Sequence, residues 1–332
     1  MKKIIVTGGA GFIGSAVVWK LNRLGINNII VVDSLGTSDK WKNLVKLKFN
    51  DYIEKDDFLS DLLNGKFDNL EVDTVFHLGA CSSTINPDKR YYIKNNFEYS
   101  KNIVKYAIKK ECRFIYASSG ATYGDGELGF SDDEDILERL SPLNMYGYSK
   151  HLFDLWLQNN SLLDKVVGLK YFNVFGPNEY HKGEMRSFIV KAYEQINSSP
   201  DKKVRLFKSH RPDYKNGEQL RDFIYIKDAV EMTVFFYERK DISGIFNVGT
   251  GETHSFNELV NAVFEALGLK PNIEYIDMPS SIINQYQYYT KAEIDKIRRK
   301  GYSLPVRKFS DAVKEYVQKY IVPQKYLADY KE

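Results

Sequence analysis

The sequence predicts an α/β fold built on a doubly wound parallel sheet, with a smaller C-terminal α/β lobe. Short apolar runs of the length of buried strands alternate with segments that have the period of amphipathic helices. A glycine-rich turn joins the first of these runs to the first helical segment. Because parallel strands need a crossover connection, usually a helix, this alternation favours a parallel sheet with helices on both faces.

The expected elements follow in order along the first 175 residues. KKIIVTG at 2–8 has the pattern of a buried strand, residues 11–25 have a helical pattern that Gly25 ends, and NIIVVD at 28–33 is the next strand. Further strands are expected at 72–80, 112–119 and 166–175, and helices at 91–110 and from about residue 145. These segments together predict one continuous parallel sheet.

The pattern of expected secondary structure changes after the Gly-Pro pair at 176–177. A helix near 184–197, a polar loop KSHRPDYKNGEQ at 208–219, short strands such as IFNVG at 245–249, and terminal helices are expected. Residues 176–332 therefore form mainly a smaller lobe, while a segment at about 222–250 is expected to return to the first domain. Ligands bind at the carboxyl ends of strands in open α/β sheets, so the loops of this lobe should close over that edge.

Composition excludes several classes of protein. The 332 residues are 43% hydrophobic, and 47 basic against 44 acidic residues leave a net charge of +3, which predicts a soluble globular protein and no nucleic-acid partner. Cys81 and Cys112 form no disulfide framework, which favours a reducing, cytoplasmic location. The five histidines have no metal-type spacing, so no metal is expected. No apolar run reaches about 18 residues, so no membrane span is expected.

Three glycines between the first strand and the first helix indicate a phosphate-binding turn. Gly8, Gly11 and Gly14 are spaced three apart in TGGAGFIG. Glycines there let backbone N–H groups approach a pyrophosphate at the helix N-terminus, where the dipole favours negative charge. Asp33 ends the next strand about 20 residues on, where an acid binds ribose hydroxyls. The sequence therefore predicts a Rossmann-type dinucleotide-binding domain over residues 1–175.

The identity of the dinucleotide depends on three charged residues. Asp33 alone favours NAD, because a carboxylate repels the 2′-phosphate of NADP. Lys40 lies in the loop after Asp33, and Lys55 comes at the end of the strand-like stretch DYIEK at 51–55; both could supply the positive charge that a 2′-phosphate needs. The alternative is that both are ordinary surface lysines.

Tyr146 and Lys150 in YGYSK are candidate catalytic residues. Their i, i+4 spacing places both side chains on one face of a helix. A nearby ammonium and a cationic nicotinamide favour the phenolate of a tyrosine, which can then exchange a proton with a sugar hydroxyl while the nicotinamide exchanges hydride. Ser119 ends the strand CRFIYASS and could bind the same hydroxyl, whereas its neighbour Ser118 is expected to cap backbone groups. The alternative for Tyr146 and Lys150 is that they lie at the edge of an ordinary amphipathic helix and have no catalytic role.

The motifs TGGAGFIG, ASSGATYG, YGYSK, RDFIYIKDAV and FNVGTG resemble the extended short-chain dehydrogenase/reductases that modify nucleotide sugars. This resemblance spans essentially the whole chain and implies that a bound nicotinamide cofactor oxidises and then re-reduces one substrate. Dehydratases of this fold usually carry an Asp-Glu pair after the serine, where this chain has Gly120-Ala121. A cofactor-sensing regulator without catalysis tends to lose the Tyr/Lys pair, which is present here.

Lys182, in NEYHKGEMRS, is a candidate second acid/base. An epimerase that works through a ketone must handle protons on both faces of one carbon, and one tyrosine cannot sit on both. A lysine can serve on the second face if burial or a neighbouring cation lowers its pKa. The alternative is that His181 and Lys182 are exposed loop residues.

The string KYFNVFGPNEYHKGEMRS, with ACSST at 80–84 and QYQYYT at 285–290, resembles the ADP-L-glycero-D-manno-heptose 6-epimerase family. The resemblance implies inversion at C6 of the ADP-heptose, a nucleotide-sugar precursor of lipopolysaccharide, with NADP as the usual cofactor. It implies Tyr146 and Lys182 as alternate acid/bases, Lys150 as the cofactor-linked lysine and Ser119 as the supporting serine. Members of this family form homo-oligomers, pentamers among them.

The same resemblance implies two sets of binding residues. Expected cofactor contacts are Gly8, Gly11, Phe12, Ile13, Gly14, Asp33, Ser34, Lys40, Lys55, Leu78, Gly79, Ala80, Cys81, Ser82, Asn95, Tyr146, Lys150, Val174 and Lys182. Expected substrate contacts are Ser119, Asn173, Glu184, Lys191, Phe207, Lys208, Ser209, Arg221 and Tyr286.

Arg221 and two departures from the family pattern concern the substrate. The planar guanidinium of Arg221 suits a diphosphate, the alternative being an ion pair with Asp222 or Asp228. Glu184 and Lys191 stand where the family often has a small residue and a histidine, and the loop at 208–219 is longer than in some members. These departures bear on the nucleotide and sugar pocket more than on the chemistry.

Overall fold

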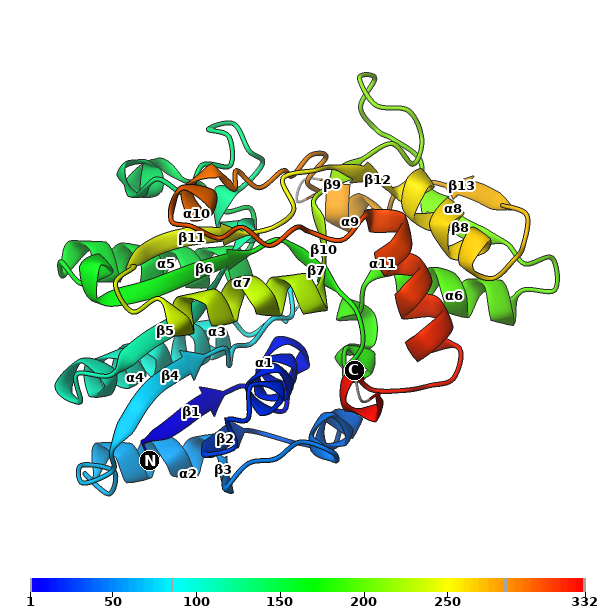
Figure 1. The fold of residues 1–332 in the computed structure, drawn as a ribbon. Coiled ribbons are helices and arrows are strands. Elements are labelled where there is room, and N and C mark those ends of the chain that lie inside the picture. Colours follow the sequence, from blue (N-terminus) through cyan, green and yellow to red (C-terminus); the bar gives the residue numbers. More distant parts are fainter. Residues whose placement is uncertain (1, 85, 284–285, 331–332) are drawn as a thin grey trace.

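A seven-stranded sheet in which all paired strands run parallel organises the larger part of the computed structural model, which describes residues 2–84, 86–283 and 286–330. The strand order is β11-β6-β5-β4-β1-β2-β3. The strands that follow β1 are first added on one side of it (β2, β3) and then, from β4 on, on its other side, so the order reverses between β1 and β4. The strands are β1 (Lys3–Thr7), β2 (Ile29–Asp33), β3 (Asp51–Glu54), β4 (Val72–His77), β5 (Arg113–Ser119), β6 (Val166–Tyr171) and β11 (Gly244–Val248). This topology confirms the predicted doubly wound fold and provides a switch point for a ligand (Figure 1).

Helices cover both faces of this sheet because alternate strand residues point to opposite sides. In β1, Ile4 and Val6 pack in a core with α1 and α7, whereas Ile5 packs in a separate core with α2, α4 and α5. The helices are α1 (Phe12–Arg23), α2 (Lys55–Leu63), α3 (Lys89–Tyr92), α4 (Tyr99–Lys109), α5 (Met145–Asn159) and α7 (Ile226–Glu238). A π-helical segment, Ile93–Glu98, joins α3 to α4.

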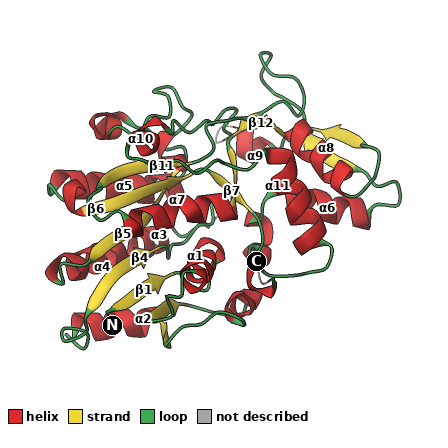
Figure 2. Cartoon of the chain, viewed as in Figure 1, coloured by secondary structure: helices red, strands yellow, loops and turns green. Residues whose placement is uncertain are grey.

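The smaller part consists of helices around short two-stranded sheets, and it lies to the right in Figure 2. Strand pairs are β7 (Asn173–Phe175) with β10 (Phe223–Tyr225), β9 (Leu220–Arg221) with β12 (His254–Ser255), and β8 (Val204–Phe207) with β13 (Ile273–Ile276). Its helices are α6 (Phe188–Ser198), α8 (Phe256–Ala266), α9 (Ser280–Ile283) and α11 (Phe309–Glu315), whereas α10 (Asp295–Arg299) lies beside β11 of the large sheet (Figure 1). A capping box formed by Ser255 and Glu258 starts α8.

Three element boundaries differ from the prediction. The strand expected at 72–80 ends at His77. The strand expected at 166–175 is interrupted at Phe172, because β6 pairs with β11 whereas β7 pairs with β10 in a separate sheet. The helix expected near 184–197 begins only at Phe188, since residues 180–185 form a 3₁₀ helix (η6) in which Gly183 has a φ of +52°.

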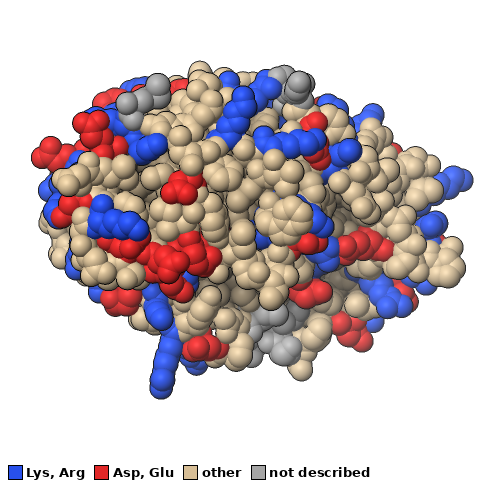
Figure 3. Space-filling model, turned by 90° about the horizontal axis from the view of Figure 1, so that it is seen from below, with Lys and Arg blue, Asp and Glu red and all other residues tan. Residues whose placement is uncertain are grey.

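The surface carries both signs of charge. Figure 3 shows acidic and basic side chains interspersed over one face of the molecule, as the near balance of 47 basic and 44 acidic residues leads one to expect. Among the described residues, no helix combines the length and the apolar character needed to cross a membrane.

Candidate active site

The glycine-rich turn fixes a close approach of three segments. Gly8 has a φ of +69°, and a Cβ atom built there would lie 2.5 Å from the backbone nitrogen of Gly79. A Cβ atom on Gly14 would lie 2.0 Å from the carbonyl oxygen of Gly8. Only glycine fits at these two positions, so the start of α1 packs directly against the carboxyl ends of β1 and β4.

The N-terminus of α1 offers backbone donors that the helix itself does not pair. Its N-cap residue is Gly11, which has no side chain to cap the helix, and its first turn contains no acidic residue. The N–H groups of Phe12 and Ile13 therefore have no acceptor within the helix. Together with the helix dipole they form a site suited to a phosphate or pyrophosphate.

Asp33 holds the phosphate turn in place. Its Oδ2 accepts hydrogen bonds from the backbone N–H groups of Ala10 (2.8 Å) and Gly11 (3.1 Å). Its Oδ1 pairs with the ammonium of Lys40 at 2.7 Å, and the Lys40 side chain is only 23% exposed. The structure therefore places Lys40 beside Asp33, in contrast to the alternative of an ordinary surface lysine.

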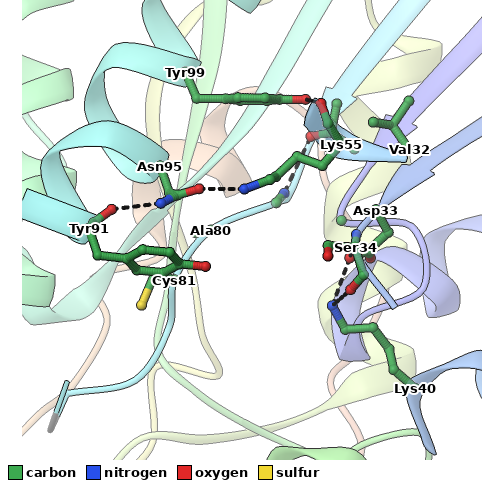
Figure 4. A pocket seen from close by; sticks show the side chains of 13 residues that line it. Val32, Asp33, Ser34, Lys40, Lys55, Ala80, Cys81, Tyr91, Asn95 and Tyr99 are labelled. Atoms are coloured by element: carbon green, nitrogen blue, oxygen red, sulfur yellow. Dashed lines mark hydrogen bonds and ion pairs between the residues drawn. The ribbon is translucent and has the colours of Figure 1, made fainter. Parts of the chain in front are cut away.

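A pocket of about 200 Å³ opens next to Asp33 at the topological switch point (Figure 4). The Lys55 ammonium lies across it and donates a hydrogen bond to Asn95 Oδ1 at 2.6 Å. The expected cofactor contacts that line this pocket are Gly8, Asp33, Ser34, Lys40, Lys55, Gly79, Ala80, Cys81 and Asn95. The pocket has the position and polarity of a site for the adenosine half of a dinucleotide.

Four residues of this lining were missed by the sequence analysis: Thr7, Val32, Tyr91 and Tyr99. Tyr91 and Tyr99 lie four residues before and after Asn95 on one helical segment. Because residues four apart share a helix face, the predicted contact at Asn95 was a signal that could have identified both tyrosines.

The helix α5 carries the predicted Tyr/Lys pair and begins with a side-chain cap. Asn144 Oδ1 accepts a hydrogen bond from the Gly147 N–H at 2.9 Å. One turn after Tyr146, the Lys150 side chain is 4% exposed and its ammonium donates to the carbonyl oxygen of Ala117 at 2.7 Å. Burial lowers the pKa of Lys150 to about 8.

We expect the substitution Lys150→Met to stabilise the cofactor-free protein in a pH-dependent manner. The Lys150 pKa of about 8 in the folded state lies below its value of about 10.4 in an unfolded chain. Between these pH values the unfolded state binds more protons, so stability rises with pH, and below pH 8 the full cost of about 3 kcal/mol is present. Urea unfolding should show the variant more stable at pH 7, with the difference shrinking toward pH 10. A difference independent of pH would contradict this.

Ser119 lies next to Tyr146 at the end of β5. Burial raises the pKa of Tyr146, and a hydrogen bond from Ser119 opposes that rise. The phenol is therefore protonated at neutral pH in this structure. Ser119 Oγ also accepts from the Ala121 N–H at 3.1 Å, whereas Ser118 donates to Asp154 Oδ2 at 2.7 Å. The expectation that Ser118 caps backbone groups is wrong, since Ser119 makes that contact.

Asp154 joins the catalytic helix to the sheet. It is fully buried, accepts a hydrogen bond from Tyr116 on β5 at 2.8 Å, and lies 3.7 Å from the ammonium of Lys170 on β6. Since Asp154 follows Lys150 by one helical turn, these contacts fix α5 against β5 and keep Tyr146 beside Ser119.

Lys182 lies over the start of α1. It belongs to η6 (Tyr180–Met185), and its ammonium is 5.1 Å from the centre of the Phe12 ring. Burial lowers the pKa of Lys182, while the negative charge of Glu179 acts in the opposite direction. Neither Lys182 nor His181 is an exposed loop residue, and His181 Nδ1 lies 3.3 Å from Asn43 Nδ2.

Arg221 is a buried cation without a carboxylate partner in the part of the chain that the structure describes. Its side chain is 7% exposed and donates to the backbone carbonyls of Leu220 and Gln287. The two carboxylates considered as alternatives are engaged elsewhere, Asp222 by Thr250 and Asp228 by Arg307. A buried guanidinium of this kind is suited to a bound anion.

The expected substrate contacts Phe207, Tyr286 and Arg221 lie close together. The rings of Phe207 and Tyr286 are 6.5 Å apart, and the Arg221 guanidinium is 5.3 Å from the Tyr286 ring. Asn173 follows β6 and lies 3.5 Å from the Thr290 hydroxyl. In the motif QYQYYT, Gln285 lies outside the described residues.

The two departures from the family pattern contact each other. Glu184 and Lys191 form an ion pair at 3.3 Å, with the Glu184 side chain 80% exposed. Lys191 and Phe207 also line a second hollow of about 720 Å³ beside α6 and β8.

The long loop at 208–219 packs on Tyr288. The Tyr288 hydroxyl accepts from the His210 N–H at 2.9 Å, and the Arg211 guanidinium is 5.1 Å from the Tyr288 ring. Ser209 takes part through its N–H, which donates to Asn216 Oδ1, and Lys208 pairs with Asp277 at 3.0 Å. No group of three metal-ligating side chains occurs among the described residues.

Comparison with known proteins identifies the family. The model of the NAD dependent epimerase/dehydratase family matches residues 4–249. The chain belongs to this family. A protein of Nitratidesulfovibrio vulgaris named ADP-L-glycero-D-manno-heptose-6-epimerase is 52% identical over 96% of this chain and 97% of its own length. A protein of the same name from Fusobacterium nucleatum is 44% identical over 97% of this chain and 98% of its own length. The predicted family is thus confirmed.

Solved structures of epimerases share the fold of this family member. The ADP-L-glycero-D-manno-heptose-6-epimerase of Helicobacter pylori superposes with a TM-score of 0.79 at 28% identity, covering 96% of both chains. A UDP-N-acetylglucosamine 4-epimerase of Methanobrevibacter ruminantium superposes with a TM-score of 0.80 at 26% identity, covering 98% of this chain and 99% of that chain. The epimerase fold therefore extends through both the sheet and the smaller part.

Proposed function

We propose that this chain inverts C6 of ADP-D-glycero-D-manno-heptose, giving ADP-L-glycero-D-manno-heptose through a transient ketone. The observation that carries this proposal is the 52% identity to a protein named for that activity over 96% of the chain. The family model matches residues 4–249, which include the phosphate turn, the Tyr146 helix, the Lys182 loop and Arg221. Residues 1–175 with about 222–250 would bind the cofactor, and the rest of 176–332 the nucleotide sugar.

The phosphate turn and its neighbours fit a nicotinamide dinucleotide. The uncapped start of α1, the glycine-only contacts and the pocket beside Asp33 are all features that such a ligand requires. A nicotinamide held by these residues would supply reversible hydride transfer with the substrate carbon. The residues of this chain supply binding, orientation and proton transfer.

Two side chains handle protons in this proposal. Tyr146, hydrogen-bonded to Ser119, exchanges a proton with the C6 hydroxyl on one face of the carbon. Lys182, whose pKa burial lowers, does so on the other face. Lys150, held by the Ala117 carbonyl, keeps a positive charge near the phenol. Arg221 binds the diphosphate.

The activity can be tested by incubating the purified protein with ADP-D-glycero-D-manno-heptose and following the C6 configuration by NMR. Conversion is the expected result. Because a UDP-N-acetylglucosamine 4-epimerase superposes equally well, UDP sugars serve as the second arm of this assay. Turnover of a UDP sugar without conversion of the heptose would replace the proposed substrate by another nucleotide sugar.

Within this proposal the cofactor is NADP, because Lys40 and Lys55 bring two positive charges to the pocket beside Asp33. We expect Lys40→Met to weaken binding of NADP by about 10- to 100-fold and to change NAD binding far less, since a hydrogen bond to a charged group contributes about 1.5–3 kcal/mol. Fluorescence titration with both cofactors measures this. Lys42→Met, an exposed lysine paired with Asp39, is the matched control. Equal losses for both cofactors would contradict the proposal.

A further inference from the structure

We propose that Glu179 is the residue that positions Lys182 for proton transfer, an inference that rests on the proposed function. Lys182 makes no side-chain hydrogen bond or ion pair among the described residues, and its ammonium lies 5.1 Å from the centre of the Phe12 ring. The location of the ammonium therefore depends on the backbone of the loop that carries it. The contacts that fix this backbone converge on Glu179.

Glu179 closes the loop from both ends. Its side chain is fully buried, and Oε1 accepts hydrogen bonds from the Gly176 N–H at 3.3 Å and the Ser187 hydroxyl at 2.7 Å. Oε2 accepts from the Ser187 N–H at 2.5 Å. Gly176 and Ser187 are the first and last residues of the loop at 176–187 that carries Lys182. The Glu179 carboxylate therefore joins the two ends of this loop. The Lys182 N–H itself donates to the Glu179 carbonyl at 3.0 Å.

The same carboxylate ties the loop to the last part of the chain. The Tyr316 hydroxyl, 137 residues away in sequence, donates to Glu179 Oε1 at 2.9 Å. Next to Glu179, Asn178 donates to Ser15 Oγ on α1 and accepts from the Leu327 N–H, each at 2.9 Å. Figure 1 shows the red C-terminal segment lying against the green loop, close to α1. The loop is thus held on the side of the phosphate turn.

Glu179 also supplies the negative charge that acts on Lys182. The other titratable groups of the loop do not replace it. Burial lowers the pKa of His181 to about 4, and burial raises the pKa values of Tyr180 and Tyr316, so all three are neutral at pH 7. Glu184 and Arg186 pair with Lys191 and Glu194 at the exposed side of α6. Lys40 adds a positive charge near His181.

The test is Glu179→Gln, which keeps the size of the side chain and removes its charge. We expect kcat to fall by about 100-fold with little change in KM, the size of effect that follows when a reacting group is misplaced by about 1 Å. The titration of Lys182 itself should shift to lower pH. Reductive ¹³C-methylation followed by NMR reports that titration without reference to activity, with the Lys182 signal assigned from Lys182→Arg.

Two further variants make the test specific. Tyr316→Phe removes one hydrogen bond to Glu179 while the ring stays, and we expect a smaller change in the same direction even if Glu179→Gln does not fold. Glu315→Gln is the matched control, because Glu315 directly precedes Tyr316 but its carboxylate binds the Lys227 ammonium at 2.7 Å instead of contacting Glu179. Glu315→Gln should lower the free energy of unfolding without changing kcat or the pH at which Lys182 titrates.

The possible outcomes separate this inference from the proposed function. An unchanged Lys182 titration and kcat in folded Glu179→Gln, or in Tyr316→Phe if the first variant does not fold, overturns the positioning role. Equal shifts in Glu315→Gln also overturn it, since they would reflect general destabilisation. A fully active Lys182→Met would instead remove Lys182 from the proposed chemistry, while the titration would still show whether Glu179 holds the ammonium.

Discussion

Replacing Tyr146 by phenylalanine is expected to lower kcat for heptose epimerisation by about 10²- to 10⁴-fold, the usual contribution of a general acid/base. The change deletes only the hydroxyl that is hydrogen-bonded to Ser119, while the ring keeps its packing at the start of α5. Cofactor and substrate binding should therefore persist. The measurement is the initial rate of change in C6 configuration, together with cofactor affinity.

Tyr148→Phe is the control for this substitution. Tyr148 lies two residues further on the same helix, and its side chain is 46% exposed. Its loss of a hydroxyl should leave kcat within about twofold, in line with the small effects of surface substitutions. Comparable losses in both variants would show that the Tyr146 hydroxyl has no special role.

Lys182→Met is expected to reduce epimerisation by a similar factor of about 10² to 10⁴, because one face of the substrate carbon would lose its proton-transfer group. Methionine keeps a long, unbranched side chain against Phe12, so the loop should retain its fold. Burial already lowers the pKa of this lysine, and removal of its charge should therefore not destabilise the protein. Epimerisation rate and thermal unfolding measure the two effects.

The appropriate control for Lys182 is Lys46→Met. Lys46 is 56% exposed and pairs with Asp329 on the surface. Its replacement should leave both turnover and KM unchanged. If Lys182→Met matched this control in activity, Tyr146 would have to serve both faces or a different group would have to act on the second.

Local patterns were sufficient to predict the sheet and the phosphate turn. Strand-length apolar runs, the glycine spacing of Gly8, Gly11 and Gly14, and the acid at Asp33 are all features of short sequence stretches. The structure places Gly8 and Asp33 in the lining of one pocket, because they lie at the carboxyl ends of β1 and β2, which are neighbouring strands. The boundary of β6 could not be predicted, because it depends on which strand pairs with residues 173–175.

Contacts between distant segments could not be predicted from local sequence patterns. Nothing around Glu179 in the sequence indicates that its carboxylate meets Tyr316, and nothing around Ser118 indicates Asp154 as its partner. The choice of partners for Arg221 likewise depended on Thr250 and Arg307 occupying the two nearby carboxylates. Side-chain pairing of this kind is decided by tertiary packing, whereas residue type only restricts the options.

The contacts of Asn178 with Leu327 and of Glu179 with Tyr316 have a consequence for biosynthesis. A chain still being made on a ribosome contains the glycine turn, the tyrosine helix and Lys182 long before these two last donors emerge. We therefore expect the loop at 176–187 to reach its final conformation only after translation has passed residue 327. A nascent chain whose sheet has already folded is then expected to remain inactive until these contacts form.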